Sequence, residues 1–110
     1  MSSKWRRFEV LLPLQFNDAL CQIVMNPTRL LAAAVLEIVD HFGAVSYETQ
    51  NVEGQWRHGG VIVRDNLAKI IVDVPDLISN RRWMKQYRDR WRSMFEQVQL
   101  WMISYSVDVE

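Results

Sequence analysis

The sequence predicts an α+β fold, because its apolar residues follow two different periods. Apolar and polar residues alternate, as in half-buried β-strands, in the stretches 5–16, 45–74 and 98–109. Apolar residues recur every three or four positions, as in amphipathic helices, in the stretches 27–42 and 79–97. Gly59-Gly60 divides the middle alternating stretch into two strands. We therefore expect one α+β domain over residues 1–110, with the order strand, helix, strand, strand, helix, strand.

The first strand and the first helix have clear local signals. Phe8 and Val10 alternate with the charged Arg7 and Glu9, which predicts a strand, although Leu11 and Pro13 interrupt its polar side. Asn26-Pro27 is a typical helix start, since Asn caps free N–H groups and Pro tolerates the first helical position. Gly43 can take the positive φ that often follows a helix, so we expect this helix to end near Phe42.

The second half of the chain repeats this pattern after a hairpin. We expect His58-Gly59-Gly60 to form a hairpin loop longer than two residues, and Val61–Val74 to be the returning strand. Ser79 or Asn80 is the expected N-cap of the second helix. In the last strand we expect Trp101 to lie on one face, and Leu100 and Met102 to lie on the other.

This order is that of the ferredoxin-like βαββαβ fold, a four-stranded antiparallel sheet with two helices on one face. Its first and third strands are central, which suits the apolar run Leu67–Val74. Two helices cover only one face. Leu11, Leu100 and Met102 are expected on the other face, opposite Phe8, Val10, Leu12 and Trp101. An apolar sheet face in water marks an interaction site, so we expect a homodimer, or a lid formed by 17–26, to cover it.

Composition limits the class of protein. Of 110 residues, 49% are hydrophobic and 24% charged, which is typical of a soluble globular domain. Cys21 is the single cysteine, so no internal disulfide forms, and the sequence shows neither a signal peptide nor a membrane span. We expect a cytoplasmic protein without a membrane partner. Thirteen basic and thirteen acidic residues cancel, which disfavours a dedicated nucleic-acid binder.

Polar residues capable of ligand chemistry gather in the predicted hairpin. His58 titrates near neutral pH, arginines bind anions, and a carboxylate acts as a general base. The candidate ligand-binding residues are Glu53, Trp56, Arg57, His58, Arg64 and Asp65. Hairpin tips are ordinarily polar, so a solvated turn clamped by Trp56 is the structural alternative.

The second predicted helix carries a basic stripe. The residues spaced along one side of it are Arg81, Lys85, Arg88 and Arg92. Such a stripe can contact phosphates, which makes nucleic-acid binding a further hypothesis. A solvated helix face explains the stripe equally well. The glycine-aromatic motif of ferredoxin-like RNA binders is missing from the third strand.

No established catalytic motif is present. The sequence has no phosphate-binding glycine loop, no glycine-flanked nucleophilic serine and no paired-histidine metal motif. We therefore predict neither a catalytic residue, a metal nor a cofactor, and leave open whether the chain is an enzyme.

Three segments resemble a family of small uncharacterised bacterial proteins. They are FEVLLPLQFND, VEGQWRHGGVIVRDNLAKIIVDVPD and YRDRWRSMFEQVQLWMISYSVDV. The family has a GxW-containing hairpin, a strand ending in a V-P-D turn and a helix leading into an F-x-Q segment. The resemblance covers most of the chain except residues 19–35, and Ala19 stands where family members often have Gly. It implies a ferredoxin-like pattern and no particular activity. We therefore expect a small binding or interaction domain.

Overall fold

A computed structural model describes residues 4–13, 27–58, 61–95 and 100–110, with side chains for 4–12, 29–48, 68–95 and 100–110. Its elements in chain order are β1 (Trp5–Pro13), α1 (Pro27–Phe42), β2 (Ser46–His58), β3 (Val61–Pro75), α2 (Ile78–Met94) and β4 (Met102–Val107). All six predicted elements are present. The expected Asn26 cap and the 17–26 lid lie outside the described residues.

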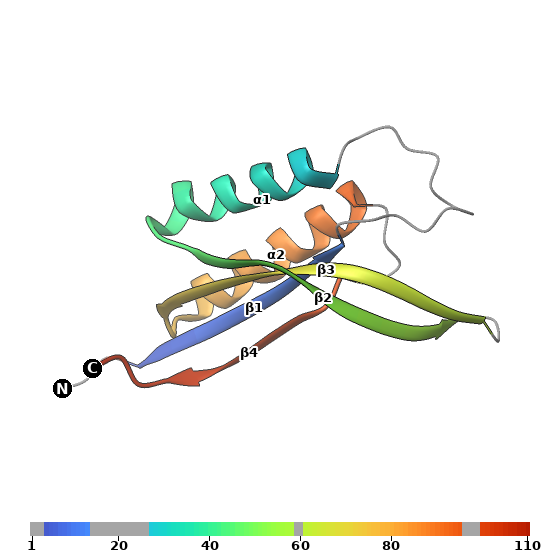
Figure 1. The fold of residues 1–110 in the computed structure, drawn as a ribbon. Helices are drawn as coiled ribbons and strands as arrows, with labels where there is room; N and C mark the ends of the chain where they lie inside the picture. The colour runs from blue at the N-terminus through green and yellow to red at the C-terminus, as the bar shows by residue number, and fades with distance from the viewer. Residues whose placement is uncertain (1–3, 14–26, 59–60, 96–99) are drawn as a thin grey trace.

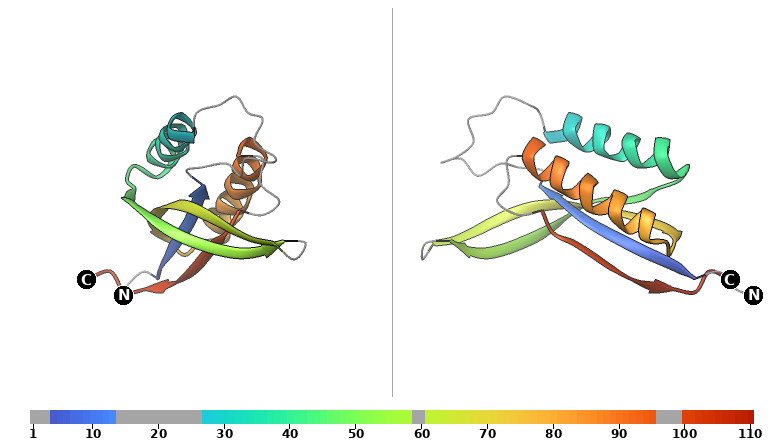
Figure 2. Two further views of the ribbon diagram at one scale, coloured as in Figure 1. Left: turned by 45° about the vertical axis from the view of Figure 1, so that its right-hand side comes forward. Right: turned by 180° about the vertical axis from the view of Figure 1, so that it is seen from behind.

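The four strands form one antiparallel sheet in the order β2-β3-β1-β4. Both helices lie on the same face of this sheet, as Figure 1 and the views in Figure 2 show. The ferredoxin-like prediction is therefore confirmed, including the central positions of the first and third strands. No helix among the described residues is long and apolar enough to cross a bilayer.

The core lies between the helices and the sheet. In β1 and β3, alternate apolar residues point toward the helices and are almost fully buried: Phe8, Val10, Leu12, Ala68, Ile70, Val72 and Val74. Leu30, Ala34 and Ile38 bury one stripe of α1, and Met84, Tyr87 and Trp91 bury one stripe of α2. The Tyr87 hydroxyl donates a 2.9 Å hydrogen bond to the Ala34 carbonyl, which satisfies this buried polar group and links the two helices.

The C-terminus of α1 agrees with the prediction from the sequence, whereas the N-terminus of α2 differs from it. Gly43 has φ +87°, and its amide donates a 2.8 Å hydrogen bond to the Val39 carbonyl, as expected for a helix C-terminus. The N-cap of α2 is Leu77, with no side-chain cap, so the prediction of Ser79 or Asn80 was wrong. The Asn80 side chain instead donates to the Pro75 carbonyl at 2.9 Å, which ties α2 to the end of β3.

The faces of the last strand are the reverse of the prediction. Leu100 is 3% exposed in the core and Met102 packs against it, whereas Trp101 is 55% exposed. The reason is register: Met102 pairs with Val10, and directly opposed residues in antiparallel strands share a face. Trp101 and Ile103 therefore lie on the face without helices.

The β2–β3 hairpin is longer than predicted. Its strands remain paired up to His58 and Val61, so only Gly59 and Gly60 separate them in sequence, and the expected longer loop was wrong. A register shift interrupts the pairing between Glu48 and Val52. Such an irregularity bends a strand and increases its twist. Beyond it the two strands continue past the rest of the sheet as a projecting ribbon, visible in Figure 1.

Candidate functional site

The face of the sheet opposite the helices is the strongest candidate site in the described residues. We call it the open face, and it carries Arg7, Glu9, Leu11, Lys69, Ile71, Asp73, Trp101, Ile103 and Tyr105. Trp101, Ile103 and Tyr105 are between 40% and 55% exposed. The expectation of apolar groups on a second face is therefore confirmed, although Trp101 is on it while Leu100 and Met102 are not.

Two charge pairs cross the strands of the open face. The Arg7 guanidinium donates to both carboxylate oxygens of Asp73, with Nε–Oδ1 at 2.8 Å and Nη2–Oδ2 at 2.9 Å. Lys69 Nζ lies 3.3 Å from Glu9 Oε1. Since both pairs join β1 to β3, they help to hold the two central strands in register on the open face.

Tyr105 joins this network from β4. Its hydroxyl donates a hydrogen bond to Glu9 Oε2. The bond lowers the pKa of Glu9 and raises the pKa of Tyr105, because it favours the charged carboxylate and the neutral phenol together. Asp73 in turn raises the pKa of Arg7, chiefly by accepting its hydrogen bonds. Each cation of the open face therefore lies beside an acid.

The candidate hairpin residues all lie in paired strands rather than in a turn. Register places Glu53 opposite Asn66, Gly54 opposite Asp65, Gln55 opposite Arg64 and Arg57 opposite Ile62. The predicted hairpin is therefore confirmed, but His58, which was expected in its loop, lies in a paired strand. Their side chains lie outside the described part of the chain, so their role as a ligand site stays a prediction.

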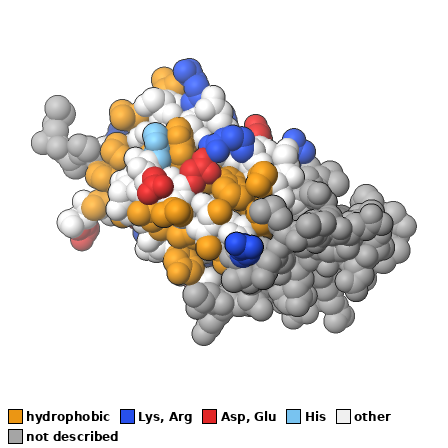
Figure 3. Space-filling view, turned by 90° about the horizontal axis from the view of Figure 1, so that it is seen from above, with side chains coloured by type: hydrophobic (Ala, Val, Ile, Leu, Met, Phe, Trp, Pro, Cys, Tyr) orange, Lys and Arg blue, Asp and Glu red, His pale blue; other side chains and the backbone are white. Residues whose placement is uncertain are grey.

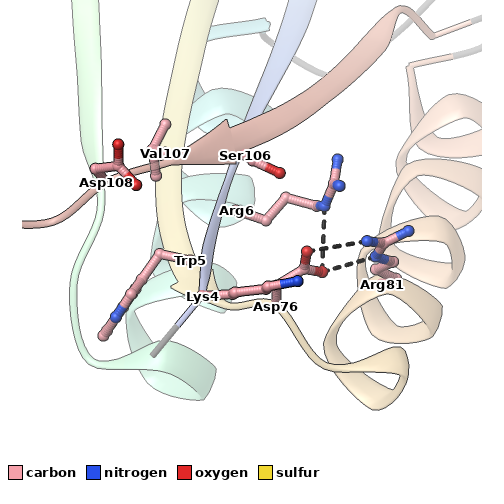
Figure 4. A pocket seen from close by; sticks show the side chains of 8 residues that line it. All are labelled: Lys4, Trp5, Arg6, Asp76, Arg81, Ser106, Val107 and Asp108. Atoms are coloured by element: carbon pink, nitrogen blue, oxygen red, sulfur yellow. Dashed lines mark hydrogen bonds and ion pairs between the residues drawn. The ribbon is translucent and has the colours of Figure 1, made fainter. Parts of the chain in front are cut away.

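A shallow hollow of about 410 Å³ lies at the other end of the molecule, near both termini. Figure 4 shows its lining, in which the Asp76 carboxylate faces two guanidinium groups. Arg81 Nε lies 2.8 Å and Arg6 Nε lies 3.2 Å from Asp76 Oδ1. Arg81 and then Arg6 lower the pKa of Asp76 to about 2. The cluster connects β1, the β3–α2 junction and α2, which is first of all a structural role.

The predicted basic stripe is divided in the structure. Arg81 forms a bidentate ion pair with Asp76, and Arg88 Nε lies 3.1 Å from Oδ1 of the neighbouring Asp89. Figure 3 shows Lys and Arg side chains scattered among acidic and apolar ones on the helix side. Lys85 and Arg92 complete the four predicted positions. Nucleic-acid contact through this stripe stays a prediction that the arrangement does not strengthen.

A row of neighbouring aromatic rings also follows α2. Trp83, Tyr87 and Trp91 succeed one another at centroid separations of 5.5 and 6.2 Å, and His41 of α1 stacks on Trp83 at 4.1 Å. Trp91 Nε1 donates to Glu37 at 2.8 Å. Within the described ranges, no group of three or more His, Cys, Asp or Glu side chains is placed to hold a metal ion.

Sequence reasoning missed the network Arg7–Asp73 and Lys69–Glu9–Tyr105. A signal was present, because Arg7 and Glu9 occupy polar positions of one alternating strand, and Lys69 and Asp73 occupy those of another. Only the pairing register shows which charge meets which, and register is a tertiary property.

The sequence matches no protein-family model and no curated protein. The fold is similar to that of several solved structures. CutA1 from Oryza sativa has a TM-score of 0.66 at 9% identity, over 99% of this chain and 84% of that one. CutA from Xylella fastidiosa has a TM-score of 0.65 at 11% identity, over 98% and 88%. A phage SAM lyase in complex with S-methyl-5′-thioadenosine has a TM-score of 0.62 at 14% identity, over 100% and 93%. At these identities the chain shares with them a ferredoxin-like fold.

Proposed function

We propose that the chain is a small binding domain that assembles with copies of itself through the open face, in the simplest case as a homodimer. The observation that supports this most is the exposure of Trp101, Ile103 and Tyr105 side by side on a face without helices. Large apolar side chains gathered on one surface favour a protein contact, because burying them releases ordered water.

The charges of the open face favour a second copy as the partner. Arg7 and Lys69 balance Asp73 and Glu9, so the face has no excess charge of either sign. A face that carries both members of each pair is complementary to itself, as a two-fold interface requires. Because Arg7 and Lys69 are both paired with acids, the open face is less suited to binding the phosphate backbone of a nucleic acid.

Light scattering after size-exclusion chromatography tests this proposal. We expect the wild-type chain to elute with at least twice its 13.0 kDa mass. Ile103→Asp places a carboxylate among the exposed apolar groups and should reduce the mass to that of one chain, because burying an unpaired charge is costly. A wild-type monomer at the highest soluble concentration would contradict the proposal.

A matched control is available on the helix side. Leu36 is 58% exposed, more than Ile103 at 41%, but it lies on α1. Leu36→Asp should leave the mass of the assembly unchanged. If both variants dissociate it equally, the contact is not specific to the open face. Far-ultraviolet circular dichroism establishes that both variants are folded.

A second candidate function is binding of a nucleoside thioether at the hairpin residues Glu53–Asp65. It is supported by the phage SAM lyase with S-methyl-5′-thioadenosine bound, whose fold matches this chain over 93% of that enzyme. Trp56, two arginines and two acidic residues in the hairpin are residue types suited to stacking on a base and hydrogen bonding a ribose.

Calorimetric titration with S-methyl-5′-thioadenosine tests this second function. We expect saturable binding that Arg64→Ala weakens and that Arg88→Ala, on the helix side, leaves unchanged. The absence of heat, together with unchanged tryptophan fluorescence, would contradict it. Adenosine and methionine serve as half-ligand controls, since a thioether site should bind each more weakly than the joined molecule.

A further inference from the structure

We propose that the projecting ribbon of one copy adds to the outer edge of β4 in a second copy. The ribbon consists of Glu53–His58 and Val61–Asn66, and its backbone pairing runs from Glu53–Asn66 to His58–Val61. This inference rests on the self-association proposed above and specifies which segments meet.

Among the described strands, the ribbon has no third strand beside it. The last pair between β1 and β3 is Pro13 with Leu67, so β3 continues from Asn66 to Val61 with β2 as its only partner in the described sheet. Figure 2 shows both strands extending away from the helices and the rest of the sheet. A two-stranded ribbon alone is marginally stable in water, so an extension of this length needs a further surface to pack on.

The sequence of the ribbon also contains apolar residues, whose burial is favourable. Val61, Ile62 and Val63 are consecutive, and Trp56 is paired with Val63 across the ribbon. A run of apolar residues in a strand favours burial against a protein surface over contact with water.

The outer edge of β4 is the matching partner. β4 is the last strand in the sheet order and pairs only with β1 among the described strands, so its other edge presents unpaired backbone N–H and C=O groups. β4 has six residues, Met102–Val107, and the stretch of β3 that β1 leaves unpaired also has six, Val61–Asn66.

The other sheet edge, on β2, is a weaker match. On the open face, the exposed side chains of β4 include Ile103 and Tyr105, whereas those at the body end of β2 are Ser46 and Glu48. Tyr47 of β2 is also exposed, but it pairs with Ile70 and so lies on the helix side. Apolar neighbours make strand addition more favourable, because side-chain burial accompanies the new backbone hydrogen bonds. The ribbon of one copy is therefore expected on the β4 side of the next.

This arrangement has a consequence for the hairpin candidates. Arg57, Arg64 and Asp65 lie on ribbon strands beyond the end of β1. In the proposed assembly these positions lie at the boundary between two copies, so a ligand site built from them is completed by the second copy.

Cysteine cross-linking between two different variants tests the proposal. In a Cys21→Ser background, one variant carries Ser104→Cys in β4, and a series of others carries cysteine at each ribbon position from 61 to 66 in turn. After mixed refolding and mild oxidation, we expect a disulfide-linked pair from the Ser104→Cys variant and some members of the series, because Cβ atoms on adjacent strands meet disulfide geometry. A further variant with Leu36→Cys in place of Ser104→Cys should give no cross-link.

Light scattering on the same samples separates the two possible failures. An assembly of at least two copies with no cross-link at any ribbon position overturns the ribbon proposal and leaves self-association intact. A chain that remains monomeric overturns both. A cross-link confined to the ribbon and β4 supports the proposal.

Removing the ribbon gives an independent test. Val52 and Leu67 are directly paired, so a two-residue Asn-Gly turn can replace residues 53–66 without disturbing the sheet below. We expect this variant to keep the circular dichroism of the body and to lose the mass of the assembly. If it assembles as well as the wild type, the ribbon is not the contact.

Discussion

At the scale of single residues, Asp76 is the best-connected charge in the described structure. It follows β3 directly, and its carboxylate accepts hydrogen bonds from Arg6 of β1 and Arg81 of α2. Arg6 also donates to Ser104 of β4 at 3.0 Å, so the cluster joins three strands and a helix. Its side chain is only 9% exposed, and the partner Arg81 is 47% exposed, so solvent screens part of the attraction.

The lowered pKa of Asp76 predicts an acid-dependent loss of stability. The pKa falls from 3.8 to about 2 on folding, so the stabilisation is complete above pH 4 and is lost as the pH falls from 4 towards 2. Asp76→Asn should lower the urea midpoint at pH 7 and flatten its change over that acid range. Asp73→Asn, at the more exposed pair with Arg7, is the control and should have a smaller effect. Equal effects would mean that Asp76 acts as an ordinary surface charge.

Tyr87 is a polar residue that is fully buried in the core. Burial raises its pKa, so its hydroxyl stays protonated and donates to the Ala34 carbonyl. Tyr87→Phe should lower the free energy of unfolding by about 1 kcal/mol, the net value of one such hydrogen bond. Tyr105→Phe is the matched control on the exposed sheet face and should cost less. A neutral result for Tyr87→Phe would indicate that the helix pair is held by ring packing alone.

At the scale of elements, the two helices stabilise the fold through one apolar stripe each. Ile38 is fully buried on α1, and Leu36, two residues earlier, is 58% exposed. Ile38→Ala should lower the free energy of unfolding by about 2–5 kcal/mol, because it removes apolar contacts and leaves a cavity. Leu36→Ala should change it by less than about 0.5 kcal/mol. Urea denaturation of both variants distinguishes a buried from an exposed position on the same helix.

The strands divide into a supported and an unsupported part. β3 has 15 residues, of which Leu67–Pro75 pair with β1 and the remainder pair with β2 alone. The charges of Arg7, Glu9, Lys69 and Asp73 hold the supported part from the open face, while apolar residues hold it from the helix side. The unsupported part is the ribbon that we propose adds to β4 of a second copy, in addition to the contact through the open face.

At the scale of the whole molecule, self-association predicts a concentration-dependent melting temperature. An assembly binds folded chains and not unfolded ones, so mass action raises Tm as protein concentration rises. We expect Tm to increase over a concentration series for the wild type, and to remain constant for Ile103→Asp. Differential scanning calorimetry provides the measurement. A wild-type Tm independent of concentration would count against the assembly in the range tested.

The order of elements and the amphipathic character of both helices were predictable from the sequence, because periodicity is a local property. The central position of Leu67–Val74 was also predictable, since it is the most apolar of the predicted strands and a strand with a neighbour on each side is the most buried. The open face was predicted only as a second face that carries apolar groups. The exposed Trp101 and the Tyr105–Glu9 bond were not predictable, because they depend on how β4 pairs with β1.

By itself, the sequence determined the fold class, the termini of α1 at Pro27 and Gly43, and the end of β3 at Pro75, because these follow from residue spacing, proline and glycine. The tertiary structure decided which face of β4 meets the helices, which charges pair across β1 and β3, and how far the hairpin projects. The physical reason is that a shift of one residue in strand register reverses every side chain. The sequence restricts that register, but the packing of the whole sheet selects it.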